Sequence, residues 1–276
     1  MPVEFLTLEQ ERRYGRYAGE PTPTQLARSF HLDDVDRTLG WEKRGNHNRL
    51  GWALQLCTVR FLGTFLADPT DVPTLVINYL ATQLGITDIT CLERYRVSET
   101  RWDHATEIRQ RYGYRDFSEQ PGHWRLVRWL YGRAWLSAEG PSLLFDLTTA
   151  RLVEHKILLP GVSVLARLVA SVRDRAANRL WRVLFQLPNP QQQKQLEELL
   201  LTADNTRQTP LDRLRRTPAR IGASALVDAL ARLVEVRALG INKLDVSRVP
   251  PSRLKVLART ATIARDQAIA RMPLGV

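Results

Sequence analysis

Apolar residues recur along most of this chain at intervals of three and four positions, and almost nowhere do they alternate with polar ones. That spacing is typical of amphipathic helices, whereas half-buried strands require strict alternation. Residues 46–66 give the clearest case, because Leu50, Leu54, Cys57 and Phe61 fall on one side of a helix. The sequence therefore predicts a mostly α protein with no substantial sheet.

The same period predicts further helices along the rest of the chain. They cover residues 75–84, 99–112, 124–138, 142–156, 163–187, 190–201, 223–239 and 252–271. Gly85 follows the first of these as a natural C-terminal cap. None of the apolar runs is long enough to span a bilayer, and Cys57 and Cys91 lack the spacing of a zinc site.

Charge is the first property that bears on function. The formal net charge is +11 and the pI is about 10.2, and 35 of the 40 basic residues are arginine. A field of this sign attracts polyanions, and arginine binds phosphate and guanine with two parallel hydrogen bonds. Nucleic acid is therefore the leading partner class, although a G+C-rich genome would also replace lysine with arginine.

The positive charge is concentrated in the second half of the chain. Residues 1–150 carry a net charge of −1, whereas residues 151–276 carry +12. The motif Leu159-Pro160-Gly161 interrupts two long periodic segments close to this change. We therefore predict two helical subdomains: a first DNA-binding domain in residues 1–150, and a second, strongly basic DNA-binding domain in residues 151–276 that also begins a linker or dimerisation region.

A helix-turn-helix element is predicted in the first domain. Residues 80–86 supply a small residue followed by a glycine turn, and the helix over residues 99–112 would follow them. On that helix His104 and Arg111 share one flank that could face a groove. The DNA-binding candidates in this region are Arg101, His104, Arg109, Arg111 and Arg115. The alternative is an ordinary solvated helix whose charge is balanced by acidic neighbours.

The second concentration of candidates begins on residues 163–187. Leu168, Val172, Ala176 and Leu180 predict the core-facing side of this helix, so other sides are free for contact. The DNA-binding candidates here are Arg167, Arg175, Asn178, Arg179 and Arg182. A short basic loop then offers Arg213, Arg215, Arg216 and Arg220, which suit phosphate contacts or a minor groove unless the loop is only a solvated linker.

Catalytic motifs are not found. The sequence has no GxxxxGK[ST] loop, GxGxxG turn, GxSxG elbow or HExxH helix, and its five histidines lack metal-ligand spacing. Asp33, Asp34 and Asp36 are better explained as helix-capping residues than as metal ligands. We therefore expect no catalytic residue, no metal, no cofactor and no small-molecule substrate for these residues, and no membrane association.

One long motif resembles a known family. Residues 48–63, NRLGWALQLCTVRFLG, resemble the NRLGxAxQLCxxRFLG signature near the N-terminus of Tn3-family transposases. Further blocks are similar in the same order, among them ATQLG at residues 81–85, LLPG at 158–161 and VRALG at 236–240. The resemblance thus extends over essentially the whole chain.

The resemblance implies a specific role. In this family the N-terminal region binds the terminal inverted repeats of the transposon through tandem helical domains, as a dimer on paired ends. The catalytic core, an RNase H-like fold with three carboxylates that bind divalent metal ions, lies far toward the C-terminus of a much longer chain. Sequence-specific binding of double-stranded DNA in a bacterial cytoplasm, close to the nucleoid, is therefore the expected role. A homodimer would form through regions partly beyond residue 276.

Three alternatives stay open at this point. The chain could act as a truncated, standalone regulator that occupies transposon ends without cutting them. It could be a helical scaffold that binds other proteins through apolar surfaces. It could also be an active nuclease or transposase, which would need a carboxylate cluster that the sequence does not reveal.

Overall fold

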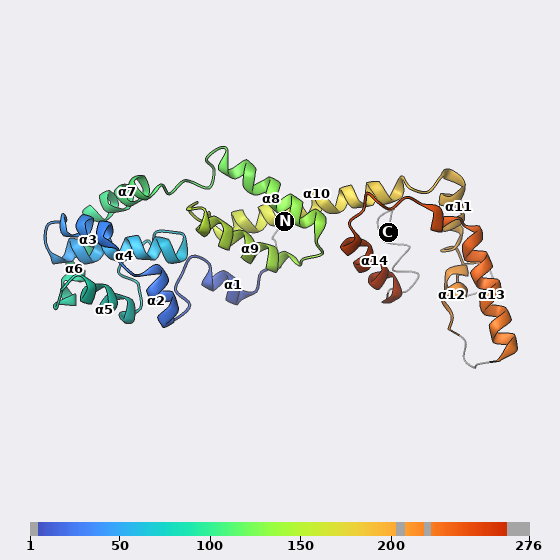
Figure 1. Cartoon of the computed structure of the whole chain (residues 1–276), viewed down its shortest axis with the longest axis horizontal. Helices are drawn as coiled ribbons and strands as arrows, with labels where there is room; N and C mark the ends of the chain where they lie inside the picture. The colour runs from blue at the N-terminus through green and yellow to red at the C-terminus, as the bar shows by residue number, and fades with distance from the viewer. Residues whose placement is uncertain (1–4, 203–207, 218–221, 264–276) are drawn as a thin grey trace. The chain divides into compact units, whose positions relative to one another are not determined.

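The described part of the chain is mostly helical, as the computed structural model in Figure 1 shows. The structure describes residues 5–202, 208–217 and 222–263. Within those ranges it contains no strand, and the nearest approach to a sheet is an isolated parallel bridge between Arg115 and Ile157. The predicted mostly α class is confirmed. No helix in the described ranges combines the length and apolar character that a bilayer crossing requires.

The chain divides into two compact units that are interleaved in sequence. Unit 1 comprises Met1–Leu130 and Gly140–Ala170, and unit 2 comprises Tyr131–Glu139 and Ser171–Val276. Helices α8 (Gly122–Leu136) and α10 (Val162–Phe185) each contribute residues to both units. The division into two DNA-binding domains, residues 1–150 and 151–276, is a statement about function, and it stays a prediction.

Unit 1 is built around α4 (Asn46–Leu62), in which ten consecutive residues from Leu50 to Val59 are buried. The helices that complete this unit are α1 (Leu8–Arg13), α2 (Pro23–Ser29), α3 (Asp34–Trp41), α5 (Thr74–Gln83), η1 (Ile89–Cys91), α6 (Leu92–Arg96), α7 (Thr100–Tyr112) and α9 (Pro141–Glu154). Of these, α2, α3, α5, α6, α7 and α9 all contact α4. The NRLG motif thus forms a helix whose middle is surrounded on all sides.

Two glycines let neighbouring segments approach α4 closely. A Cβ atom at Gly51 would overlap the ring of Tyr95 on α6, so only glycine fits where the two helices touch. Gly63 ends α4 in the left-handed region, with a φ of 77°. Its carbonyl accepts a hydrogen bond from the backbone of Leu159 at 2.9 Å, which ties the LLPG motif to the end of the helix.

The acidic residues at the start of α3 cap the helix, as the sequence predicts. Asp33 accepts a hydrogen bond from the backbone of Asp36 at 2.8 Å, and the Asp36 carboxylate accepts one from the backbone of Asp33. The other oxygen of Asp36 is buried and accepts hydrogen bonds from Arg60 at 2.7 Å and Tyr112 at 2.5 Å. Capping and an internal ion pair therefore account for this acidic cluster.

The helix-turn-helix prediction is not confirmed. Gly85 does form a turn after α5, with a φ of 65°. However, residues 84–99 contain η1 and α6 before α7 begins, so α5 and α7 are not joined by one tight turn. The proposed pairing of these two helices stays a prediction.

Unit 2 contains the last parts of α8 and α10 together with α11 (Pro190–Glu198), α12 (Pro210–Arg215), α13 (Ala223–Ala238), η2 (Ile241–Lys243) and α14 (Pro251–Ile263). Val172, Ala176 and Leu180 of α10 are buried, as the predicted stripe requires, while Leu168 is only half-buried. On α13 no residue is buried, and Leu226, Leu230 and Leu233 are exposed. This unit therefore has a sparser core than unit 1.

The segment expected to be a basic loop is partly helical. Pro210 occupies the first turn of α12, and Thr209 and Asp212 form a capping box around it. Arg213 and Arg215 consequently lie on a short helix, and Arg216 is its C-terminal cap.

Candidate nucleic-acid interface

His104 does not occupy the exposed flank expected from the sequence. Its side chain is only 7% exposed, and its Nδ1 lies 2.9 Å from the hydroxyl of Tyr95. Burial, reinforced by the charge of Lys43, lowers the pKa of His104 to about 4, so the ring is neutral at pH 7. The prediction that this histidine faces a groove is wrong, because α7 turns it toward α6 and the core.

Two of the candidate arginines on α7 are engaged within unit 1. Arg101 is half-buried, donates to the carbonyl of Arg96 at 2.8 Å and lies over the ring of Trp102 at 5.0 Å. Arg109 forms ion pairs with Asp116 and Glu119, which hold the segment after α7. These contacts give both side chains a structural role.

The other two candidates of this region are exposed. Arg111 forms an ion pair at 3.3 Å with Glu107, one helical turn earlier, and Arg115 donates to the carbonyl of His155 at 3.4 Å. Exposed pairs of this kind contribute little to stability and exchange readily with an external anion. Arg111 and Arg115 are therefore the more accessible candidates of unit 1.

Helix α10 carries the clearest cationic surface of the described chain. In unit 2 its exposed side presents Arg175, Asn178, Arg179 and Arg182, and we call these four residues the α10 flank. Arg175 donates to Ser171 and Arg182 donates to the carbonyl of Asn178, each at 3.4 Å and each within the same helix. Arg167, in the part of α10 that belongs to unit 1, likewise bonds the carbonyl of Ser163 at 3.2 Å and is exposed.

Arg179 is the member of the flank that contacts another element. Its guanidinium lies 4.5 Å from the ring centre of Trp135, and it donates to the hydroxyl of Tyr131 at 3.4 Å. An aromatic face under a guanidinium fixes its plane and leaves its edge free to donate to an acceptor. Trp135 thus orients a flank arginine.

The last group of candidates lies on and after α12. Arg213 forms an ion pair with Glu235 of α13, and its carbonyl and that of Arg216 accept hydrogen bonds from Arg232. Arg215 and Arg216 are exposed. Arg220 lies outside the described residues.

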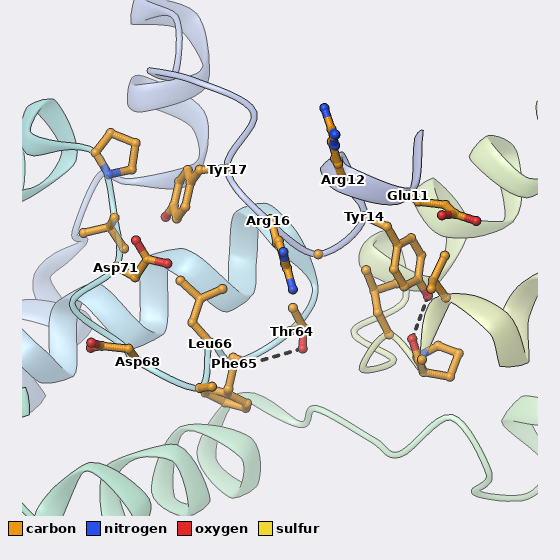
Figure 2. Close-up of a pocket in the computed structure, with 18 of the residues that line it drawn as sticks. Glu11, Arg12, Tyr14, Arg16, Tyr17, Thr64, Phe65, Leu66, Asp68 and Asp71 are labelled. Carbon is orange, nitrogen blue, oxygen red and sulfur yellow. Dashed lines mark hydrogen bonds between the residues drawn. The ribbon is translucent and has the colours of Figure 1, made fainter. Parts of the chain in front are cut away.

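Unit 1 contains a large cavity. Its volume is about 1230 Å³, and Figure 2 shows Arg16, Tyr17, Asp68 and Asp71 around it, with the Tyr14 hydroxyl bonded to the carbonyl of Pro160. Asp68 is already paired with Arg96 at 2.9 Å. The described residues contain no cluster of three His, Cys, Asp or Glu side chains that could hold a metal ion.

Comparison with protein families gives one match over most of the chain. Residues 5–172 match the model of a domain of unknown function, DUF4158. The matched segment includes α4 and extends to the first part of α10.

Curated relatives are transposases. The chain is 46% identical over 274 residues to the transposase for transposon gamma-delta of Escherichia coli (strain K12), which covers 99% of this chain and 27% of the relative. It is 29% identical over 237 residues to the transposase for transposon Tn3926 of Escherichia coli, covering 85% of this chain and 24% of the relative. It is 27% identical over 260 residues to the transposase for transposon Tn1546 of Enterococcus faecium. This match covers 93% of this chain and 26% of the relative.

The chain therefore spans about a quarter of the length of these relatives. Their names confirm the resemblance to Tn3-family transposases that the NRLG motif predicted.

Proposed function

This chain belongs to the DUF4158 family, and on that premise we propose that it binds the terminal inverted repeats of a Tn3-type transposon as the end-recognition region of a transposase. The α10 flank is the observation that carries the proposal. Its arginines and its asparagine are exposed on one helix side, and among the described residues Arg175 and Arg182 form hydrogen bonds within their own helix alone. Such side chains can bind a DNA duplex without breaking any tertiary contact.

The dimensions of the flank suit a major groove. An α-helix with its side chains is about 10–12 Å across, and the major groove is about 12 Å wide. Arginine recognises guanine, and asparagine recognises adenine, through paired hydrogen bonds at the base edges in that groove. We assign base recognition to Arg175, Asn178 and Arg182, and phosphate contact to Arg179, Arg111, Arg115 and the arginines of α12.

The proposal concerns recognition of DNA ends and assigns no cofactor, metal or cleavage step to these residues. It includes pairing of two copies when two ends are held, and residence near the nucleoid. The pairing can be measured by sedimentation equilibrium. The protein is mixed with one or with two repeat-bearing duplexes per two protein copies, and the mass of the complex is determined. A complex with the mass of one protein copy and one duplex at every concentration would exclude it.

The test is equilibrium binding to a duplex carrying the terminal repeat of the chain's own element and to a scrambled duplex, each at two salt concentrations. We expect the repeat to be bound on the order of 10³-fold more tightly. Equal affinities that fall steeply with salt would leave only a general basic surface. The absence of binding at moderate salt would favour a protein-interaction scaffold, for which the exposed leucines of α13 are the supporting observation.

Substitutions then locate the contact surface. Arg175→Gln should lower the affinity for the repeat by about 1–3 kcal/mol and relax specificity at one position. Lys194→Gln is the matched control, because it removes the same charge from an exposed position on α11. Equal losses in the two variants would contradict base recognition by the flank.

A further inference from the structure

Helix α13 presents a continuous apolar stripe on the side that the rest of unit 2 leaves uncovered. Five side chains form it, and each is between 44% and 66% exposed: Leu226, Val227, Leu230, Leu233 and Val234. Because an α-helix has about 3.6 residues per turn, these positions fall within about 120° of its circumference. The two charged residues between them in sequence, Asp228 and Arg232, lie on the opposite side. We call these five apolar residues the α13 stripe.

The opposite side of α13 holds the helix in place. Arg232 donates to the carbonyl of Arg213 on the neighbouring α12 at 3.5 Å, and Glu235 forms an ion pair with Arg213 (Figure 1). Gln192 of α11 donates to the carbonyl of Leu239, just after α13, at 3.1 Å. The half-buried residues of the helix lie on this side: Ala225, Ala229, Arg232 and Val236. The fold of unit 2 therefore turns the α13 stripe toward solvent.

The stripe has the same apolar pattern when its sequence is read in either direction. Residues 226–234 read LVDALARLV, with Leu230 at the centre, an alanine on each side of it and an apolar pair at each end. If two such helices lie antiparallel about Leu230, Leu226 meets Val234 of the second copy, and Val227 meets Leu233 of the second copy. A two-fold interface requires a surface that complements itself in this way.

The area of the stripe also suits a second copy. Its side chains expose on the order of 500 Å² of apolar surface, more than the few hundred Å² that monomeric proteins ordinarily expose in one patch. Two copies would together bury about 1,000 Å², which reaches the lower limit of a specific interface. Ala229 and Ala231 flank Leu230, and such small side chains let two helix axes approach closely.

We propose that α13 pairs with α13 of a second copy of this chain, antiparallel, with Leu230 of both copies on the two-fold axis. At each end of the contact, the aliphatic stem of Arg237 covers the small side chain of Ala223 of the second copy, and its guanidinium reaches solvent. The use of this contact to hold two DNA ends rests on the proposed function. The contact itself requires no DNA.

The first measurement is sedimentation equilibrium of the protein without DNA over a range of concentrations. The mass of the wild type should rise with concentration to that of two copies. Leu230→Glu should weaken this association by at least about 100-fold, because two carboxylates would then meet in an apolar contact. Leu201→Glu is the matched control, since Leu201 is 64% exposed in unit 2 outside α13, and its association should equal that of the wild type.

The second measurement tests the position of the axis. Leu230→Lys should also weaken association, but a mixture of Leu230→Glu with Leu230→Lys should form mixed dimers at least about 10-fold more tightly than either variant alone, because opposite charges then meet. Circular dichroism verifies that each variant keeps its helices. Val234→Glu replaces Leu230→Glu if the latter folds poorly. A mixture that stays monomeric beside a dimeric wild type would reject an axis at Leu230.

The third measurement tests the direction of the pairing by disulfide crosslinking, with Cys91→Ser in every protein to remove a partly exposed thiol. Leu226→Cys mixed with Val234→Cys should crosslink on oxidation, and each variant alone should not. Efficient crosslinking of Leu226→Cys to itself would mean that the two helices are parallel and would overturn the antiparallel contact.

Two further outcomes would overturn the proposal. A wild type with the mass of one copy at every concentration would assign the stripe to a different protein or to another part of a longer chain. A dimer that Leu230→Glu leaves intact would place the interface elsewhere. Failure of the wild type to prefer the repeat duplex would reject the proposed function, but it would leave the association measured without DNA as the test of the α13 contact.

Discussion

Helices α4 and α10 use their polar side chains in opposite ways. On α4, Gln55 donates to the Tyr95 hydroxyl at 2.7 Å and to the carbonyl of Arg101 at 2.9 Å, and Arg60 binds the buried Asp36. On α10, Arg175 and Arg182 form hydrogen bonds only within their own helix, as far as the described part of the chain extends. The comparison teaches that a cation fixed across the fold supports stability, whereas a cation bonded along its own helix is available for a ligand.

The largest expected effect tests how tightly α4 is enclosed. Gly51→Ala should destabilise the protein by more than about 3 kcal/mol, because the added methyl group overlaps the buried Tyr95 ring. Urea unfolding followed by tryptophan fluorescence measures this change. Gly132→Ala is the control, since a Cβ there meets nothing within 4 Å, and it should stabilise its helix slightly. Similar behaviour of the two variants would mean that α4 and α6 are not in close contact.

The second prediction concerns the ion pair between Arg60 of α4 and the buried Asp36. Burial by itself would raise the pKa of Asp36, but hydrogen bonds from Arg60 and Tyr112 outweigh it and hold that pKa below its usual value. Arg60→Met leaves this carboxylate buried without its cation, so we expect a loss of about 3 kcal/mol in unfolding free energy. Adding Asp36→Asn should restore part of the loss, and a simple sum of the two single losses would argue against a direct pair.

The third prediction concerns pH and the buried histidine. The folded chain holds the pKa of His104 at about 4, while an unfolded histidine titrates near 6.5. Between these values the unfolded chain binds a proton that the folded chain does not, so stability should fall by about 3 kcal/mol as the pH drops through this window. Urea unfolding at pH 7.5 and pH 4.5 should show a smaller fall for His104→Gln. An equal fall in both proteins would assign the pH dependence to other groups.

The smallest expected effect concerns the exposed arginines of α10. Arg175→Met and Arg182→Met should each change the unfolding free energy by less than about 0.5 kcal/mol, because no tertiary contact is lost. Chemical unfolding of the two variants beside the wild type provides the measurement. A loss as large as that of Arg60→Met would show that the flank has a structural role.

Most of the helices could be predicted because their burial is periodic and local. Residues 99–112 and 223–239 were expected as helices, and the structure places α7 at Thr100–Tyr112 and α13 at Ala223–Ala238. The short helix α12 was missed because its arginine-rich residues were expected in a loop, although Pro210 fits the first turn of a helix. The capping signal formed by Thr209 and Asp212 could have revealed it.

The environment of individual side chains was harder to predict than the helices. His104 was expected on an exposed flank because α7 is mostly polar, so its sequence gives little contrast between its sides. Its burial depends on Tyr95 and Gln55, which come from two other helices.

The interleaving of the two units has a consequence for how the chain is made. Residues Tyr131–Glu139 leave the ribosome before Gly140–Ala170, yet they belong to the unit that is completed only by later residues. During synthesis this short segment therefore lacks the rest of its unit until α10 has emerged. Until then Trp135 has no contact with Arg179. A gene fragment cut near residue 150 would interrupt both units at once. A cut after residue 170 would spare the segments of unit 1 but leave Tyr131–Glu139 without the rest of unit 2.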